Sequence, residues 1–87
     1  MKKIIMFILK SCPYCREALR FMEKLAAEDP RYAALDIEII DERERPDIAD
    51  AYDYYYVPTY YVGGKKLHEG AATIEAVRRV FDAALEE

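Results

Sequence analysis

The sequence lacks both an apolar run long enough to cross a membrane and an excess of basic residues. Residues 4–9 form an apolar run of only six residues, whereas a membrane-spanning helix needs about 20 and a secretory signal peptide about 7 to 15. The net charge is −4, which argues against nucleic acid because phosphate binding needs a basic surface. We therefore expect a cytoplasmic protein with neither a membrane nor a nucleic-acid partner.

Ligands for a metal ion are also scarce. The chain has only two cysteines, Cys12 and Cys15, and one histidine, His68, whereas a structural zinc ion takes four such ligands. We expect no metal site and interpret His68 as an exposed or half-buried histidine of a strand.

Linkers, internal repeats and low-complexity segments are absent as well. A chain of 87 residues with 53% hydrophobic and 34% charged residues has room for one domain, residues 1–87, with a modest core. We expect this domain to be a monomer.

What the sequence does contain is a close pair of cysteines, Cys12-Pro13-Tyr14-Cys15. Two cysteines three positions apart at the start of a helix share one face and can be bridged by a disulfide. Pro13 suits the first helical position, which needs no N–H. A sulfur at the first turn faces free N–H groups and the positive helix end, so its thiolate is favoured. We therefore predict that Cys12 is the exposed nucleophile and that Cys15 is the sheltered thiol that resolves the mixed disulfide.

The apolar pattern of the first half predicts a strand, a helix and a second strand. Residues 4–9 are apolar at every position, which is typical of a central strand covered on both faces. Helical spacing continues over 13–28 and stops at Asp29-Pro30. Leu35, Ile37 and Ile39 alternate with acids, which indicates an edge strand with one buried face.

The second half predicts a short helix, a hairpin and a last helix. The helix begins at Pro46 and continues through Ile48, Ala49 and Tyr52. Gly63-Gly64 joins strands at 59–62 and 66–69 as a hairpin, and Thr73 caps the final helix. The element order is then βαβαββα, with the first two strands parallel and the last two antiparallel.

Cys12-Pro13-Tyr14-Cys15, Val57-Pro58-Thr59, Gly63-Gly64-Lys65 and Gly70 together resemble the glutaredoxin branch of the thioredoxin-fold family. The resemblance covers nearly the whole chain. It implies an α/β thioredoxin fold with a four-stranded mixed sheet, in the order 2-1-3-4, flanked by helices. It further implies that Pro58 follows a cis peptide bond beside the dithiol. The backbone of Val57 would then pair with the substrate as a short extra strand.

The same resemblance assigns binding of the substrate or of glutathione to Lys10, Tyr14, Val57, Pro58, Gly70 and Ala71. The chain departs from the family pattern at two of these places. Lys10 stands two residues before the first cysteine, where glutaredoxins usually have a basic residue three before it. Gly70 is followed by Ala71-Ala72-Thr73, without the aspartate that holds the γ-glutamyl end of glutathione.

Our first interpretation is a thiol-disulfide oxidoreductase of cell redox homeostasis that reduces protein or glutathione-mixed disulfides. It would need no bound cofactor and would use glutathione as co-substrate. One alternative is a thioredoxin-like electron donor recharged by a flavoprotein reductase. Another is a glutathione-dependent module that binds an iron-sulfur cluster.

Two further features leave alternatives open. Lys10 and Arg16 are either solvated charges or electrostatic support for the Cys12 thiolate. Six tyrosines fall between positions 52 and 61, and we favour a role in the core and its rim over an apolar apron for the substrate.

Overall fold

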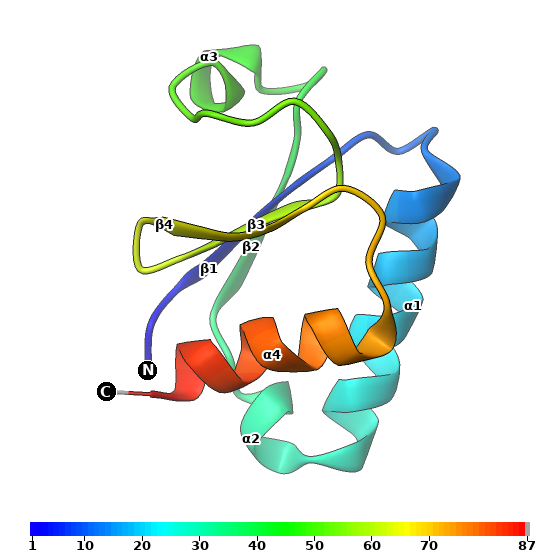
Figure 1. Cartoon of the computed structure of the whole chain (residues 1–87), viewed down its shortest axis with the longest axis vertical. Coiled ribbons are helices and arrows are strands. Elements are labelled where there is room, and N and C mark those ends of the chain that lie inside the picture. The colour runs from blue at the N-terminus through cyan, green and yellow to red at the C-terminus, as the bar shows by residue number, and fades with distance from the viewer. Residues whose placement is uncertain (87) are drawn as a thin grey trace.

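The computed structural model describes residues 1–86 and contains one mixed β-sheet with helices packed around it (Figure 1). The elements in chain order are β1 (Ile4–Ile8), α1 (Pro13–Glu28), α2 (Pro30–Ala33), β2 (Ile37–Asp41), α3 (Pro46–Ala49), β3 (Thr59–Val62), β4 (Lys65–Glu69) and α4 (Ile74–Leu85). Within this part of the chain, no helix combines the length and the apolarity that crossing a bilayer would require.

The four strands lie in the order β2-β1-β3-β4. β1 pairs with β2 in parallel, and β3 pairs antiparallel with both β1 and β4. The thioredoxin fold, its strand order and the central place of β1 are therefore confirmed. The hairpin is also confirmed, with Gly63 and Gly64 both at positive φ in the turn, a conformation that glycine adopts without steric cost.

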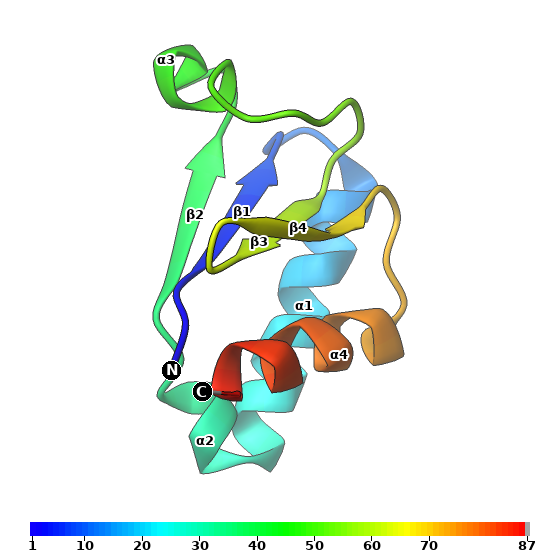
Figure 2. The same cartoon turned by 60° about the vertical axis from the view of Figure 1, so that its left-hand side comes forward.

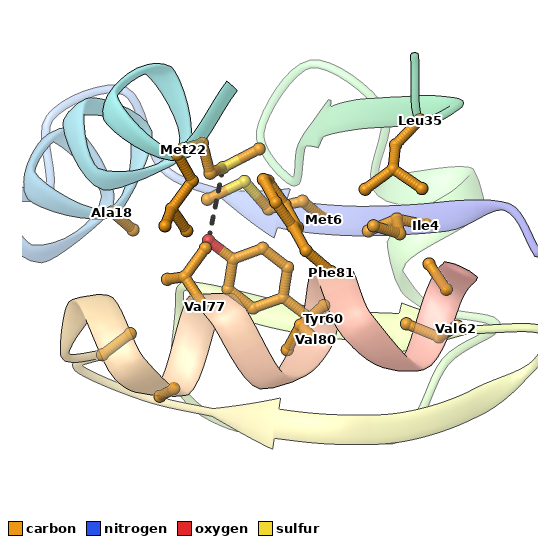
Figure 3. Packing of buried hydrophobic residues seen from close by; sticks show 14 of the residues in the cluster. Ile4, Met6, Ala18, Met22, Leu35, Tyr60, Val62, Val77, Val80 and Phe81 are labelled. Atoms are coloured by element: carbon orange, nitrogen blue, oxygen red, sulfur yellow. Dashed lines mark hydrogen bonds between the residues drawn. The ribbon is translucent and has the colours of Figure 1, made fainter. Parts of the chain in front are cut away.

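Alternating side chains of β1 point to two separate cores. Ile4, Met6 and Ile8 belong to the larger core, which α1 and α4 cover from one side of the sheet (Figure 3). Phe7 faces the smaller core, with Tyr61 and Ala49 of α3. Burying one side chain of this size contributes about 1.5 to 3 kcal/mol, so both faces of β1 anchor the fold.

Helices α1 and α4 begin and end where their local sequence predicts. Pro13 occupies the first turn of α1, which ends at Glu28 before Asp29. Thr73 caps α4, because its side-chain oxygen accepts a hydrogen bond from Ala76 N at 3.1 Å. The buried residues of α1 recur at helical spacing and are Cys15, Ala18, Met22 and Leu25.

The extra helix α2 was not predicted. The side chain of Asp29 accepts a hydrogen bond from Arg31 N at 2.9 Å, and Pro30 opens a new turn of only four residues. So short a helix leaves no apolar periodicity in the sequence. Helix α3 is equally short. It ends at Ala49, whereas the predicted helix continued through Tyr52.

The buried face predicted for β2 was right at the start of the strand and wrong at its end. The strand begins at Ile37, two residues later than predicted. Leu35 and Ile37 pack on the larger core as predicted. Ile40, and not Ile39, is buried beside Phe7 in the smaller core. Ile39 is 47% exposed although its place in the alternation predicts burial. An edge strand extends beyond the cover of its helices, so apolar alternation alone did not identify the buried face.

Candidate active site

The dithiol and Pro58 come together at one end of the sheet. Phe7 of β1 pairs with Thr59 of β3 in antiparallel register, so the end of β1 meets the beginning of β3. Cys12 follows in the turn from β1 to α1, and Pro58 directly precedes Thr59. Figure 2 shows the arrowheads of β1 and β2 at this same end of the sheet.

The two cysteines differ sharply in exposure. Cys12 is the N-cap of α1 and is half-buried, whereas the Cys15 side chain is 1% exposed. Both are free thiols. The Cys12 carbonyl accepts hydrogen bonds from Cys15 N at 3.1 Å and Arg16 N at 3.2 Å, which fixes the first turn. A reagent from solvent can therefore reach Cys12 but not Cys15.

Hydrogen bonds lower the pKa of the Cys12 thiol. Partial burial alone would raise this pKa, but N–H groups of Cys15 and Tyr14, the Cys15 thiol and the charge of Arg16 together outweigh it. These are the free donors of the first helical turn, which favour an anion. The thiolate of Cys12 is therefore stabilised at its place in the helix.

Burial raises the pKa of Cys15 to about 11. The N–H of Leu9 lowers this pKa in part, while the neighbouring Cys12 and the carboxylate of Glu42 raise it further. The two thiols are thus driven apart in acidity, with the more acidic one at the surface. This division is what a nucleophilic and a resolving cysteine require.

The structure separates the roles of the two basic residues near Cys12. The Lys10 ammonium pairs with the carboxylate of Glu44. The Arg16 guanidinium donates to the Lys10 carbonyl at 3.2 Å, folding over the turn that carries Cys12. Arg16, and not Lys10, is the charge that favours the thiolate.

Sequence reasoning missed Asp41 at the end of β2. Its side chain is 8% exposed and accepts hydrogen bonds from Lys10 N at 3.0 Å and Arg43 N at 2.8 Å. The carboxylate thereby ties the β1–α1 turn to the neighbouring strand. An acid at the carboxyl end of a parallel strand is the signal that could have identified it, since functional loops gather there.

The segment before β3 presents free backbone groups. The Val57–Pro58 bond is cis, as predicted, and Pro58 is buried. The Pro58 carbonyl accepts from Gly70 N at 2.9 Å, and the Thr59 hydroxyl donates to the Tyr56 carbonyl. Within residues 1–86, no such bond engages the N–H or C=O of Val57, which is itself half-buried against both cores.

The six tyrosines of 52–61 divide between the two interpretations. Tyr60 and Tyr61 are buried, and the Tyr60 hydroxyl donates to the sulfur of Met22 at 3.3 Å (Figure 3). Tyr52 and Tyr54 pack on Phe7 with ring centroids 4.9 and 4.8 Å away. These four build the core and its rim, as the favoured interpretation predicts.

Tyr55 and Tyr56 do not belong to either core. Their side chains are 86% and 70% exposed, and Tyr14 beside Cys12 is 58% exposed. The carboxylate of Glu69 accepts hydrogen bonds from Tyr55 N at 2.6 Å and Tyr56 N at 3.0 Å. Glu69 therefore holds the backbone of these two residues directly before Val57, a role that the sequence gave no sign of.

The region after Gly70 offers little to a charged ligand. Ala71 is exposed, and its carbonyl and that of Gly70 lie 3.2 and 3.0 Å from Nε2 of His68. The hydroxyl of Thr73 is engaged as the cap of α4. Across residues 1–86, no three histidine, cysteine or acidic side chains are grouped as a metal ion would need.

Comparisons with known proteins agree with this geometry. The sequence model of the family described as "Thioredoxin domain" matches residues 2–82. A protein named thioredoxin from Methanocaldococcus jannaschii is 37% identical over 75 residues, which are 86% of each chain.

Two solved structures are similar as well. Oxidised thioredoxin from Plasmodium falciparum has a TM-score of 0.73 at 17% identity, over 98% of this chain and 82% of its own. A protein disulfide oxidoreductase from Aeropyrum pernix has a TM-score of 0.68 at 30% identity, over 95% of this chain and 37% of its own. These relatives support a thioredoxin-like oxidoreductase and do not single out the glutaredoxin branch.

Proposed function

This chain belongs to the thioredoxin domain family, and we propose that it reduces disulfide bonds in proteins by cycling between a Cys12, Cys15 dithiol and a disulfide. The observation that carries the proposal is the placement of the two free thiols, with Cys12 half-buried at the N-cap of α1 and Cys15 buried inside the first turn; this placement lowers the pKa of Cys12 and raises that of Cys15. A thioredoxin-type disulfide oxidoreductase is the activity class that the relatives support.

The first step is attack by the Cys12 thiolate on one sulfur of the substrate disulfide. The other substrate sulfur leaves as a thiolate and takes a proton from water. Cys12 and the substrate are then joined by a mixed disulfide. During this step Cys15 stays protonated because of its raised pKa, so it does not compete for the substrate.

In the second step Cys15 gives its proton to water, and its thiolate attacks the sulfur of Cys12. The bond between Cys12 and the substrate breaks, and the second substrate sulfur leaves as a thiolate and takes a proton from water. Two electrons have passed from the dithiol to the substrate, and a Cys12–Cys15 disulfide remains. The electrons pass only between sulfur atoms of the protein and of the substrate, so the proposed reaction needs no bound cofactor.

We assign substrate recognition to the backbone of Val57, which makes no backbone hydrogen bond within the described residues and lies next to the buried Pro58. An extended substrate segment could pair with this N–H and C=O as a short strand. Such pairing uses main-chain groups and therefore tolerates varied sequences. Tyr14, Gly70 and Ala71 would line the same surface.

The electron donor in our proposal is a flavoprotein reductase, with glutathione as a weak substitute. Recognition of glutathione needs a cation for its carboxylates and an acid for its ammonium group. Here Lys10 is paired with Glu44, Thr73 caps α4, and Glu69 holds backbone N–H groups. This arrangement favours the thioredoxin-like alternative over the glutathione-dependent one.

We further propose that the protein works as a cytoplasmic monomer on disulfide-containing proteins. The reducing cytoplasm keeps such a pair available as a dithiol. The alternative of an iron-sulfur cluster module predicts a coloured protein with visible absorbance after purification, whereas the proposed oxidoreductase should be colourless.

A turnover assay tests the proposal. Reduction of insulin disulfides is measured with either a flavoprotein thioredoxin reductase and NADPH or glutathione, glutathione reductase and NADPH as the electron supply. We expect faster turnover with the flavoprotein system and none with Cys12→Ser. If the wild-type protein did not accelerate insulin reduction over the rate with dithiothreitol alone, the function would be overturned. Faster turnover with glutathione would overturn the assignment of the donor.

A further inference from the structure

We propose that Glu69 is a positioning residue that holds the Tyr55–Tyr56 backbone so that Val57 can pair with a protein disulfide substrate. The inference rests on the proposed function and adds to it a residue that acts through the backbone of the substrate-pairing segment. Glu69 lies on β4, whereas Tyr55 and Tyr56 lie in the segment that leads to Pro58.

The contacts of Glu69 converge on two consecutive peptide groups. Its Oε2 accepts hydrogen bonds from Tyr55 N at 2.6 Å and from Tyr56 N at 3.0 Å. Its Oε1 pairs with the ammonium of Lys66 at 2.7 Å, and Lys66 also donates to the Asp53 carbonyl at 3.2 Å. Strand β4 therefore holds the backbone of residues 53–56 through the Glu69 carboxylate and the Lys66 ammonium group.

These bonds leave a specific part of the segment open. The side chains of Tyr55 and Tyr56 are exposed although their N–H groups are bound. Val57, the next residue, makes no backbone hydrogen bond to any residue within 1–86. Glu69 thus restrains the backbone on one side while the side toward the substrate stays unpaired. A segment held in its binding conformation loses less entropy when the substrate pairs with it.

The Glu69 carboxylate can hold these two N–H groups firmly because it stays charged. The Lys66 ammonium and the N–H groups of Tyr55 and Tyr56 lower the pKa of Glu69 to about 2. Hydrogen bonds to a charged acceptor are roughly twice as strong as those between neutral groups. The hydrogen bonds from Tyr55 N and Tyr56 N to Glu69 therefore persist throughout the physiological pH range.

The local packing agrees with a close approach between β4 and the segment. Gly70, the residue after Glu69, has a φ of +92°, and a Cβ placed on it would come within 3.8 Å of Tyr56 Cβ. Gly70 N also donates to the Pro58 carbonyl at 2.9 Å. Glu69 and Gly70 thereby fix the segment on both sides of Val57.

The test compares Glu69→Ala and Glu69→Gln with wild type on two substrates that differ in their need for backbone pairing. Insulin is a protein disulfide, and 5,5′-dithiobis(2-nitrobenzoate) is a small one without a peptide strand. Glu38→Ala is the matched control, because Glu38 is also a strand glutamate in an ion pair, with Lys3 at 2.8 Å, on the opposite edge of the sheet.

For Glu69→Ala we expect the Michaelis constant for insulin to rise about tenfold, the equivalent of about 1.4 kcal/mol. The turnover number, the rate with the small disulfide and the alkylation rate of Cys12 should stay at wild-type values. Glu69→Gln keeps a carbonyl acceptor and should raise the constant only about twofold to threefold. Glu38→Ala should match wild type.

The competing explanation is that Glu69 only stabilises the hairpin. An unchanged constant for insulin, or equal losses with both disulfides, would overturn our inference in favour of that explanation. If Glu69→Ala does not fold, the insulin constant of Glu69→Gln decides in the same way.

Amide hydrogen exchange tests the hydrogen bonds between Glu69 and the Tyr55 and Tyr56 N–H groups independently of activity. Exchange at Tyr55 and Tyr56 should be faster in the Glu69 variants than in wild type and Glu38→Ala. Unchanged exchange would overturn the inference. A wild-type protein that reduces neither disulfide would instead show that the proposed function is wrong, while the exchange data would still report on Glu69.

Discussion

The carboxylate of Asp41, at the end of β2, accepts a hydrogen bond from the backbone N–H of Lys10, two residues before Cys12, at 3.0 Å. The two residues are 31 positions apart in sequence. This bond couples the geometry of the β1–α1 turn to the neighbouring strand, and with it the position of the nucleophilic thiol.

Replacing Asp41 by alanine should loosen this turn. We expect a melting temperature several degrees lower and faster amide exchange at Lys10, because the N–H groups of Lys10 and Arg43 lose their acceptor. Asp41→Asn keeps an acceptor oxygen and should lose less. Equal melting curves for Asp41→Ala and wild type would contradict the anchoring role.

The pH dependence of stability should report on Asp41 as well. Burial alone would raise its pKa, but the N–H groups of Arg43, Lys10 and Glu44 outweigh burial and lower it. A lowered pKa stabilises the fold above the ordinary value, about 3.9, and this contribution disappears as the pH falls through the lower folded value. Acid unfolding should therefore occur at higher pH in Asp41→Ala than in wild type.

Alkylation of the reduced protein should distinguish the two thiols. Cys12 should react with iodoacetamide with a midpoint below that of an ordinary thiol, because its pKa is lowered, while Cys15 should stay protected until the pH approaches 11. The raised pKa of Cys15 stabilises the fold below the ordinary value, and that contribution is lost as the pH rises toward 11. Mass spectrometry that finds Cys15 labelled first would reverse the assigned roles.

Arg16 and Lys10 should affect the Cys12 thiolate differently. Removing the guanidinium in Arg16→Ala should raise the pKa of Cys12, because its charge favours the anion. Lys10→Ala should leave that pKa unchanged, since the ammonium is paired with Glu44. Thiolate absorbance near 240 nm measures both, and an effect of Lys10→Ala as large as that of Arg16→Ala would contradict the assignment.

The variant Cys15→Ser should trap the reaction at its midpoint. Cys12 should still attack a disulfide, but intramolecular release is lost, so a long-lived mixed disulfide accumulates. Non-reducing electrophoresis with a protein substrate should show the disulfide-linked adduct, and dithiothreitol should cleave it. Cys12→Ser is the control and should form none. Wild-type turnover by Cys15→Ser would exclude the resolving role.

Glutathione should bind poorly. The acid that would hold its ammonium group is absent after Gly70, and losing one charged hydrogen bond weakens binding by about 1.5 to 3 kcal/mol, or one to two decades. We expect a Michaelis constant for glutathione above about 1 mM, the upper end of the usual range. A submillimolar constant in the coupled assay would mean that another acid, such as Glu69, serves glutathione.

Much of the fold could be predicted from the sequence because it depends on short-range rules. The apolar run before Cys12, the helical spacing after it and the capping residue Thr73 each act within a few positions of the chain. The motif around the cysteines indicated the dithiol for the same reason: a helix start determines which thiol is exposed and which is covered. Gly63-Gly64 likewise determined the hairpin turn.

The remaining features were decided by tertiary structure. The exposure of Ile39 depends on its place in an edge strand, and the pairing of Lys10 with Glu44 depends on two loops that meet only in the folded chain. Glu69 reaches back 14 positions to Tyr55. No periodicity or local propensity encodes such contacts, since sequence patterns report on neighbours three or four residues apart. The sequence therefore determined the reactive pair, and the sheet determined which residues hold it and present the substrate-binding backbone.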